Sequence, residues 1–307
     1  MKWLDRFPSE IRDDVASAVR LEWWTIGWIG SIIIVMGFAM GSSQAMRTAW
    51  IEDLLSIVPA VVFQVAIRLE ARQPTSAFPF GFDRAHSLAF LISAVALTAT
   101  GATLIVESAL TLVRQEHATV PPLNLFGTDI WSGWIMVAAL IYSVVPPFIL
   151  GRLKLPIARR LKDEVLHTDA MMQKADWMTG LAGVAGVIGL GLGFWWADAV
   201  AAAIISFSIL HDGTSALRIA VAELADGTPR RLGQDRIDQE AEQLHDKLAS
   251  QFPGATVRIR KTGRYMRAEV CGVEPDQAQD LAALWPGEPQ RSWRLAEVSF
   301  VPPDRRG

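Results

Sequence analysis

The chain has 307 residues, of which 51% are hydrophobic and 20% charged, and its formal net charge is −3. This charge gives no indication of nucleic-acid binding, and the single cysteine excludes an intrachain disulfide framework and a multi-cysteine zinc site. Charged residues concentrate before residue 23, in a few short loops and after residue 228. The long apolar stretches between them predict membrane spans.

The N-terminal segment, residues 1–22, contains no apolar signal-peptide core and is expected to be cytoplasmic. Within it, residues 9–22 predict an amphipathic helix with Ile11, Val15 and Val19 along one stripe. Such a helix either lies along the inner membrane surface or is a plain cytosolic leader helix.

Six apolar stretches have the ~20 residues that a helix needs to cross the hydrocarbon core. They are residues 23–42, 49–67, 87–113, 131–150, 170–193 and 196–221. Lys and Arg concentrate in the loops after the second and fourth stretches, whereas the opposite side offers Arg47 and Arg114. The positive-inside rule therefore predicts a multi-pass protein of the inner (plasma) membrane with both termini in the cytoplasm, as an even number of spans requires. The transmembrane domain is expected to cover residues 23–228.

The remaining residues, 229–307, predict a small cytoplasmic α+β domain. Ile237, Ala241, Leu244 and Leu248 mark an amphipathic helix, and two strands flank a Lys-Thr-Gly turn. A short helix over 276–285 and a last strand over 293–301 are expected to follow. No phosphate-binding loop, nucleophile elbow or other catalytic motif is visible, so the chain is not expected to be an enzyme.

Ionisable side chains inside the predicted spans are candidates for function, because each is costly in lipid. Several have ordinary explanations; Asp169, for example, is expected near a helix start, where an acid complements the helix dipole. Glu52 and Asp176 are harder to explain. Ser56 follows Glu52 by one helical turn, and Met172 precedes Asp176 by one. The other intramembrane candidates are Asp53, Glu107, Lys174, Asp198, His211 and Asp212.

Three stretches occur in an order and spacing that resemble the cation diffusion facilitators, which export divalent metal ions in exchange for protons. The first runs from Ala66-Ile67-Arg68 to Pro74 and continues through Phe78-Pro79-Phe80-Gly81-Phe82-Asp83-Arg84-Ala85. The second is Thr168-Asp169-Ala170 leading to Asp176. The third is Ala197-Asp198-Ala199, with Leu224-Ala225-Asp226 and Pro229 closing the sixth span.

The resemblance implies a transport site of four residues, two on the second span and two on the fifth, each pair four residues apart. Counting back from Arg68 without gaps places Glu52 and Ser56 at the first pair. Counting from Thr168-Asp169-Ala170 places Met172 and Asp176 at the second pair. A slip of one residue would substitute Asp53 for Glu52 but would make Ile57 its partner, so Glu52 is preferred. In the family the four are His or Asp and then Asp, followed by His and then Asp, so two ligands here are weak.

The resemblance further implies a six-helix all-α membrane bundle with a ferredoxin-like C-terminal domain, and a homodimer in the lipid bilayer. It implies no permanently bound cofactor; the divalent cation and protons are substrates, and no nucleic acid is involved. Oxygen ligands favour Mn²⁺, with Fe²⁺ intermediate, whereas the family favours zinc, so the sequence leaves the metal open among zinc, manganese and iron. The loop around Phe82 lacks the family's histidine, and His245 is expected to be a surface residue.

Two other functions stay open. Because two of the four ligands are replaced, the chain could be a degenerate, non-transporting family member that acts as a partner or regulatory subunit. It could also be a membrane-anchored binding protein whose soluble domain carries the activity, although that domain shows no site.

Overall fold

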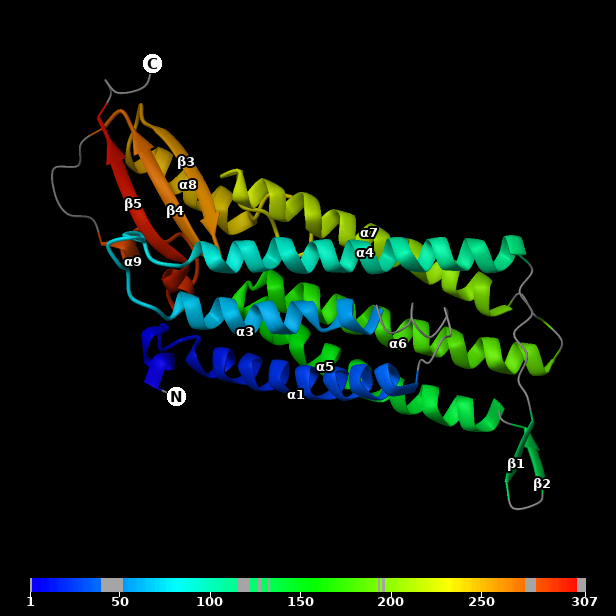
Figure 1. Ribbon diagram of the computed structural model, residues 1–307. Helices are drawn as coiled ribbons and strands as arrows, with labels where there is room; N and C mark the ends of the chain where they lie inside the picture. Colours follow the sequence, from blue (N-terminus) through cyan, green and yellow to red (C-terminus); the bar gives the residue numbers. More distant parts are fainter. Residues whose placement is uncertain are drawn as a thin grey trace.

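The computed structural model describes residues 2–39, 52–114, 122–125, 128–131, 133–192, 194, 197–273 and 280–302, with side chains over most of these ranges. Long helices run side by side as a bundle, and a small α+β domain lies at one end of it (Figure 1). The N-terminus lies at that same end, and a short β-hairpin lies at the other (Figure 1). This mostly helical architecture with a small C-terminal sheet agrees with the predicted fold class, while the number of crossings stays a prediction.

The long helices coincide with the predicted spans and extend beyond most of their ends. The first predicted span ends, and the second begins, in residues 40–51, which lie outside the described residues. Trp131, expected to open the fourth span, instead closes strand β2 (Thr128–Trp131), which pairs antiparallel with β1 (Pro122–Leu125). The bundle helices are α1 (Arg12–Ala39), α3 (Val58–Glu70), α4 (Arg84–Arg114), α5 (Gly133–Leu161), α6 (Glu164–Gly191) and α7 (Ala197–Leu224).

Within the described part of the chain, one helix, Arg84–Arg114, is both long and apolar enough to cross a membrane, with a mean hydropathy of 2.1 in its most apolar stretch. Helices α1, α5, α6 and α7 have 28 or 29 residues each. At 1.5 Å per residue that is ~42 Å, longer than a hydrocarbon core of ~30 Å. Length therefore permits a crossing by each of them, and composition singles out α4.

The apolar stripe of the N-terminal segment faces into the bundle. Ile11, Val15 and Val19 are buried in one cluster with side chains of α3, α4 and the α5–α6 region. After Arg12 the chain continues without a break into the first predicted span, so residues 12–22 form the first turns of α1 and not a separate helix. A short 3₁₀ helix, η1 (Lys2–Arg6), precedes it.

The second predicted span is interrupted in its middle. Residues 52–56 are helical, Ile57 forms a turn, and α3 starts at Val58. Pro59 lies in the first turn of α3. Backbone N–H groups in the first turn of a helix have no partner within the helix, so the missing N–H of proline costs nothing there. The same missing N–H prevents residues 52–56 and α3 from forming one regular helix. Ser56 therefore lies next to a proline kink, at which Ile57 keeps a helical backbone conformation.

Helices α4 and α7 approach each other closely through two glycines. A Cβ atom at Gly101 of α4 would lie 2.6 Å from the backbone nitrogen of Leu210, and one at Gly213 of α7 would lie 2.8 Å from the backbone of Thr98. Small residues at such positions are the usual means by which helix backbones come into contact in membranes. These two helices therefore pack backbone against backbone.

The C-terminal domain has a three-stranded sheet in the order β3-β4-β5. Strand β4 pairs antiparallel with β3 and parallel with β5, and a parallel pairing needs a crossover connection. Residues 272–294 supply it. The strands are β3 (Thr256–Thr262), β4 (Tyr265–Cys271) and β5 (Leu295–Val301), and the crossover contains α9 (Leu281–Leu284) and the 3₁₀ helix η2 (Pro289–Arg294).

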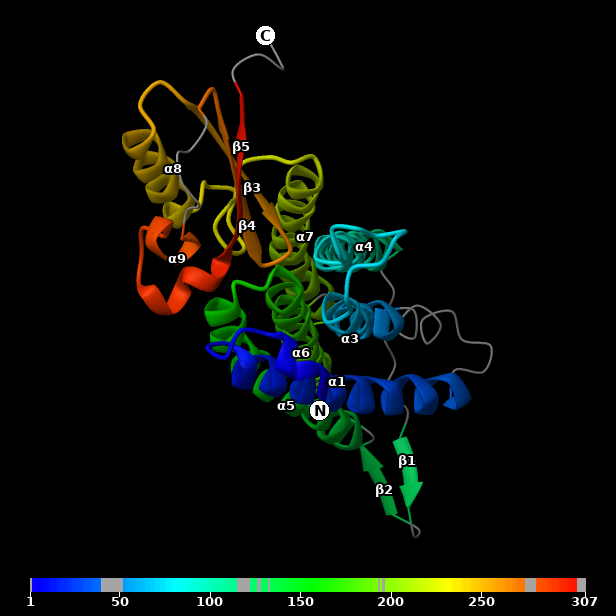
Figure 2. The same ribbon diagram turned by 90° about the vertical axis from the view of Figure 1, so that its left-hand side faces the viewer.

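Helix α8 (Gln239–Gln251) lies with α9 on one side of this sheet (Figure 2). The predicted amphipathic helix, hairpin and last strand are confirmed, and Leu244 and Leu248 pack against Met266 and Val270 of β4. The short helix expected over 276–285 is reduced to α9 where it is described, since residues 274–279 lie outside the described residues.

The turn of the β3–β4 hairpin inserts between helix ends of the bundle. The Lys261 ammonium lies 3.1 Å from Glu164, the first residue of α6, and 3.2 Å from Glu223 near the end of α7. Gly263 has a φ of +62°, and a Cβ there would lie 2.8 Å from the Asp83 carbonyl oxygen. Glycine is required at this turn both for its backbone conformation and for the close contact.

Arg264, the next residue, has no exposed surface and completes a second buried ionic contact. Its guanidinium lies 3.0 Å from Glu70 at the end of α3 and 3.2 Å from Asp163 just before α6. The imidazole of His86 lies 2.8 Å from the same Asp163 carboxylate. Burial alone would raise the pKa of Asp163, but His86 and Arg264 outweigh it and hold that pKa below its ordinary value. The C-terminal domain is thus joined to the bundle by buried charges.

Candidate metal site

The two halves of the predicted transport site meet between the interrupted second span and α6. The hydroxyl of Ser56 donates a 2.7 Å hydrogen bond to Oδ1 of Asp176, and 120 positions of sequence separate the two residues. Ser56 is buried and Asp176 half-buried. Two of the four predicted site residues therefore touch directly.

Glu52 lies one helical turn before Ser56 and is half-buried. Its Oε1 atom has no hydrogen-bond partner among the described residues. The charged groups close enough to act on its carboxylate are Glu107 of α4, Asp176 of α6 and the neighbouring Asp53, all of them acidic. An excess of buried negative charge is stabilised by protons or by a cation.

Met172, the fourth predicted residue, has no exposed surface and packs in an apolar cluster. Its neighbours there include Leu97 and Leu104 of α4 and Ile209 of α7. A thioether is a weak, soft ligand and fits an apolar wall as readily as a metal site. The structure therefore places Met172 in an apolar cluster with α4 and α7.

Among the described residues, no group of three or more His, Cys, Asp or Glu side chains is close enough to hold a metal ion. The acids around Glu52 and Asp176 therefore do not form a preformed cage. Glu107 was not predicted as a site residue, although an acid late in an otherwise apolar helix was a signal for it.

A second buried polar cluster joins α1, α5 and α6, and the sequence did not predict it as a site. The Lys154 ammonium donates to Glu22 Oε2 at 3.0 Å, to the Thr25 hydroxyl at 2.5 Å and to Asp169 Oδ2. All four side chains are fully buried. The dipole explanation for Asp169 is wrong, because α6 starts at Glu164 and Asp169 is paired with Lys154. The cluster becomes visible only in the structure, because its residues come from helices that are far apart in sequence.

The remaining intramembrane candidates lie elsewhere. Lys174 pairs with Asp212 at 3.4 Å, so this lysine neutralises a nearby acid. His211 is exposed, and the side chain of Asp198 lies outside the described residues. Lys174, His211 and Asp212 line a cavity of about 400 Å³ whose walls come from α4, α5, α6, α7 and residues 232–234.

His167 also lines this cavity, and its ring packs closely against Gly233. A Cβ at Gly233 would lie 2.4 Å from its ring, so the glycine permits the contact. Burial lowers the pKa of His167 from 6.5 to about 4, and the nearby Arg159 acts in the same direction. His167 is therefore neutral at physiological pH.

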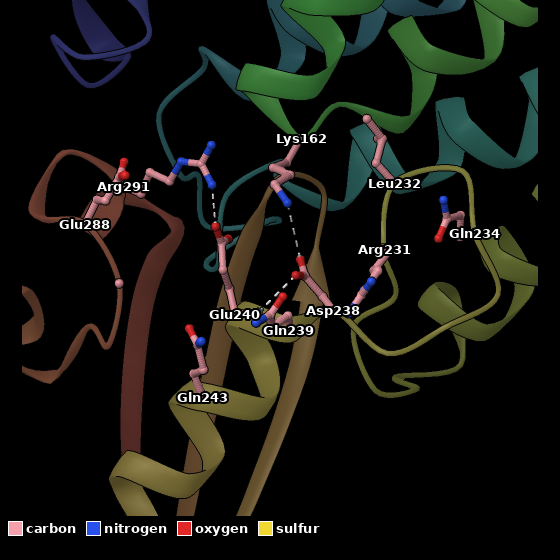
Figure 3. Close-up of a pocket in the computed structure, with 11 residues that line it drawn as sticks. Lys162, Arg231, Leu232, Gln234, Asp238, Gln239, Glu240, Gln243, Glu288 and Arg291 are labelled. Carbon is pink, nitrogen blue, oxygen red and sulfur yellow. Dashed lines mark hydrogen bonds and ion pairs between the residues drawn. The ribbon is translucent and has the colours of Figure 1, made fainter.

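A larger cavity, of about 520 Å³, lies where the C-terminal domain meets the bundle, and its charged side chains neutralise one another (Figure 3). Asp238, the N-cap of α8, lies 3.9 Å from the Lys162 ammonium, and Glu240 lies 2.5 Å from the Arg291 guanidinium. Carboxylates that already have basic partners are poor ligands for a metal cation, because binding would break those pairs. His245, on α8, is exposed.

Comparison with known proteins gives the family. The sequence model of the cation efflux transmembrane domain matches residues 25–225, more than half of the chain. The chain belongs to the cation efflux family. It is therefore a transmembrane protein of metal cation transport, and the resemblance drawn from the sequence is confirmed.

Individual members of the cation efflux family are distant relatives. A probable cation efflux system protein of Mycobacterium tuberculosis is 24% identical over 270 residues, which cover 86% of this chain and 74% of that protein. The manganese efflux system protein MneS of Bacillus subtilis is 19% identical over 65% of this chain and 64% of its own length. Mitochondrial metal transporter 1 of Saccharomyces cerevisiae is 23% identical over 67% of this chain and 44% of its own length.

Proposed function

We propose that this family member exports a divalent metal cation in exchange for protons, and that the cation binds between the second and fifth predicted spans. The observation that carries the proposal is the contact of Ser56 with Asp176. It brings together two predicted ligands next to the turn that separates residues 52–56 from α3. Interrupted helices near the middle of a bundle are the usual place for ion sites in transporters. Alternating access would then be a rocking of the other helices around this point.

In this proposal Glu52 and Asp176 are the principal ligands. Both are acids next to other acids, and an orphan carboxylate oxygen on Glu52 is available to a cation. Ser56 is a weak ligand that holds Asp176 in position, and Met172 is the weakest of the four. A set dominated by oxygen favours Mn²⁺, with Fe²⁺ intermediate, over zinc, which prefers nitrogen and sulfur. The name of the manganese efflux relative is in line with this order.

Exchange for protons follows from the chemistry of the ligands. Metal and protons compete for the same carboxylate lone pairs, so a cation that binds to acids holding protons displaces them. A carboxylate such as Glu52, on which the interacting charged groups are all acidic, meets this requirement without histidine. The proposed orientation has the C-terminal domain and both termini in the cytoplasm, and the proposed assembly is a homodimer.

One observation favours a second candidate, a non-transporting partner or regulatory subunit. In the described part of the chain no three metal-binding side chains of the His, Cys, Asp and Glu types converge. Such a subunit would keep the fold and would depend on another family member for transport.

Uptake of radioactive manganese or zinc into proteoliposomes that contain only this chain separates the two candidates. Transport driven by an outward proton gradient, and abolished by Asp176→Asn, would support the exporter. Correctly folded protein that moves neither ion would contradict it and leave the regulatory candidate.

A further inference from the structure

The cluster of Lys154, Glu22 and Asp169 has more negative than positive charge. Lysine has three N–H donors, and all three are used, by the two carboxylates and the Thr25 hydroxyl. Each carboxylate keeps one oxygen, Glu22 Oε1 and Asp169 Oδ1, without a hydrogen-bond partner among the described residues. Both side chains are fully buried. The cluster therefore contains one cation, two acids and two unsatisfied oxygens.

Within the described part of the chain, Lys154 is the one basic group found to act on Glu22. The other charged groups that act on it are Asp169 and Asp163, the second of them a further acid just before α6. From α3, which also contacts α1, Arg68 lies over the ring of Trp23 and donates to its own helix. A buried uncompensated charge costs several kcal/mol, and two carboxylates that share a site ordinarily retain one proton between them.

The cluster is placed to sense the proposed transport site. Asp169 precedes Asp176 by seven residues, which is nearly two turns, so the two acids lie on the same face of α6 about 10 Å apart. Asp169 and Lys154 are among the charged groups that act on Asp176. A change of charge at Asp176 therefore reaches the cluster through the protein interior, where screening by water is weak.

We propose that Glu22 and Asp169, bridged by Lys154, form a proton-holding site separate from the metal ligands, and that this site releases its proton when a divalent cation binds near Asp176. The inference rests on the proposed function. The charge balance is simple: the cation adds two positive charges, one proton leaves the Glu22–Asp169 pair for the cytoplasmic solution, and the ammonium stays charged. When the cation departs, the pair binds a proton again. No residue of this site touches the metal.

The first test is infrared spectroscopy of the purified, metal-free full chain at neutral pH. The parent should show the carbonyl stretch of a protonated carboxylic acid that Glu22→Gln and Asp169→Asn each remove. These substitutions preserve shape, and either one is sufficient if the other fails to fold. Asp212→Asn is the matched control, because the carboxylate of Asp212 is paired with one ammonium, that of Lys174, and shares no site with a second acid in the described contacts. The protonated acids of the transport site are expected to contribute a band that remains in both variants, so the result that would overturn the proposal is a spectrum in which neither cluster variant loses intensity relative to the parent.

The second test is calorimetry of Mn²⁺ binding in buffers of different ionisation enthalpy, which counts the protons released per cation. Glu22→Gln should bind Mn²⁺ but release about one proton fewer than the parent, and Asp212→Asn should match the parent. An unchanged proton count in Glu22→Gln would overturn the coupling. A parent that binds no metal would instead contradict the proposed function, and the infrared result would still decide whether the cluster holds a proton.

Discussion

The Arg264 guanidinium, on the turn of the β3–β4 hairpin, lies 3.0 Å from the Glu70 carboxylate at the end of α3. The Arg264 side chain is fully buried and that of Glu70 is 3% exposed, and 194 positions of sequence separate the two residues. A buried charge that loses its partner destabilises the fold strongly. The stability of the membrane bundle therefore depends on this contact with the C-terminal domain.

Replacing Arg264 with Met should destabilise the whole protein by about 3 to 5 kcal/mol, since Glu70 and Asp163 would lose their shared cation. Thermal unfolding of the detergent-solubilised protein measures this as a lower midpoint. Arg258→Met, at an exposed position on the neighbouring strand β3, is the control and should leave the midpoint nearly unchanged. Equal effects of the two substitutions would show that the buried contact contributes little.

Asp176→Asn and Glu52→Gln should each reduce cation uptake about tenfold or more, because too few strong ligands would remain to hold a dehydrated ion. Asp53→Asn should be milder, since adjacent helical residues point about 100° apart. Uptake into inverted vesicles, normalised to the amount of inserted protein, is the measurement. Normal transport by both of the first two variants would show that the assigned ligands are wrong.

The double substitution Ser56→Asp with Met172→His rebuilds the family's usual ligand set around Glu52 and Asp176. Zinc binding to the purified double variant should be tighter than to the parent and should release more protons, because imidazole is a good zinc ligand. Met172→His alone controls for the cost of placing an imidazole in the apolar cluster with Leu97. A folded double variant with no gain in zinc affinity would mean that these four side chains do not converge.

The free energy of unfolding should fall as the pH drops from about 6.5 toward 4, in part because of His167. Its pKa is about 4 when folded and near 6.5 when unfolded, so in this range the unfolded chain binds more protons than the native one. His167→Gln should flatten this dependence, and His245→Gln, at an exposed position, should not. Chemical unfolding at several pH values measures the slopes; identical slopes in all three proteins would contradict the prediction.

Cysteine labelling tests the orientation in a background that lacks Cys271. Arg72, just after α3, and Arg159, in the last turn of α5, are both exposed and should react only from the cytoplasmic side. Asn124, on the hairpin at the opposite end, should react from outside intact cells. Labelling of Arg72 or Arg159 from outside would rule out this topology.

The sequence was sufficient to predict the helices and the order of elements in the C-terminal domain, because each depends on a local pattern of apolar side chains. It also identified Ser56 and Asp176, which the structure brings into contact. Their pairing followed from resemblance and not from periodicity, since no local pattern relates residues 120 positions apart.

Other contacts could not be predicted from the sequence for a physical reason. Lys154, Glu22 and Asp169 are ordinary helix residues until α1, α5 and α6 pack, and only then do they lie within hydrogen-bond distance. The same holds for Lys261, at the end of β3, which contacts Glu164 and Glu223 only because the hairpin inserts between α6 and α7. Long-range pairs of charges carry no signature in a single sequence.

The glycine contacts of α4 with α7 have a consequence for motion. Because Gly101 and Gly213 leave no side-chain layer between the two backbones, one helix cannot slide past the other without steric overlap. Both helices also contact the inserted hairpin turn, through Ser87 and Glu223. The same turn also holds the start of α6 through Glu164 and the end of α3 through Glu70. A tilt of the C-terminal domain would consequently move α4 and α7 as one unit and pull on the ends of the two helices that lead to Ser56 and Asp176.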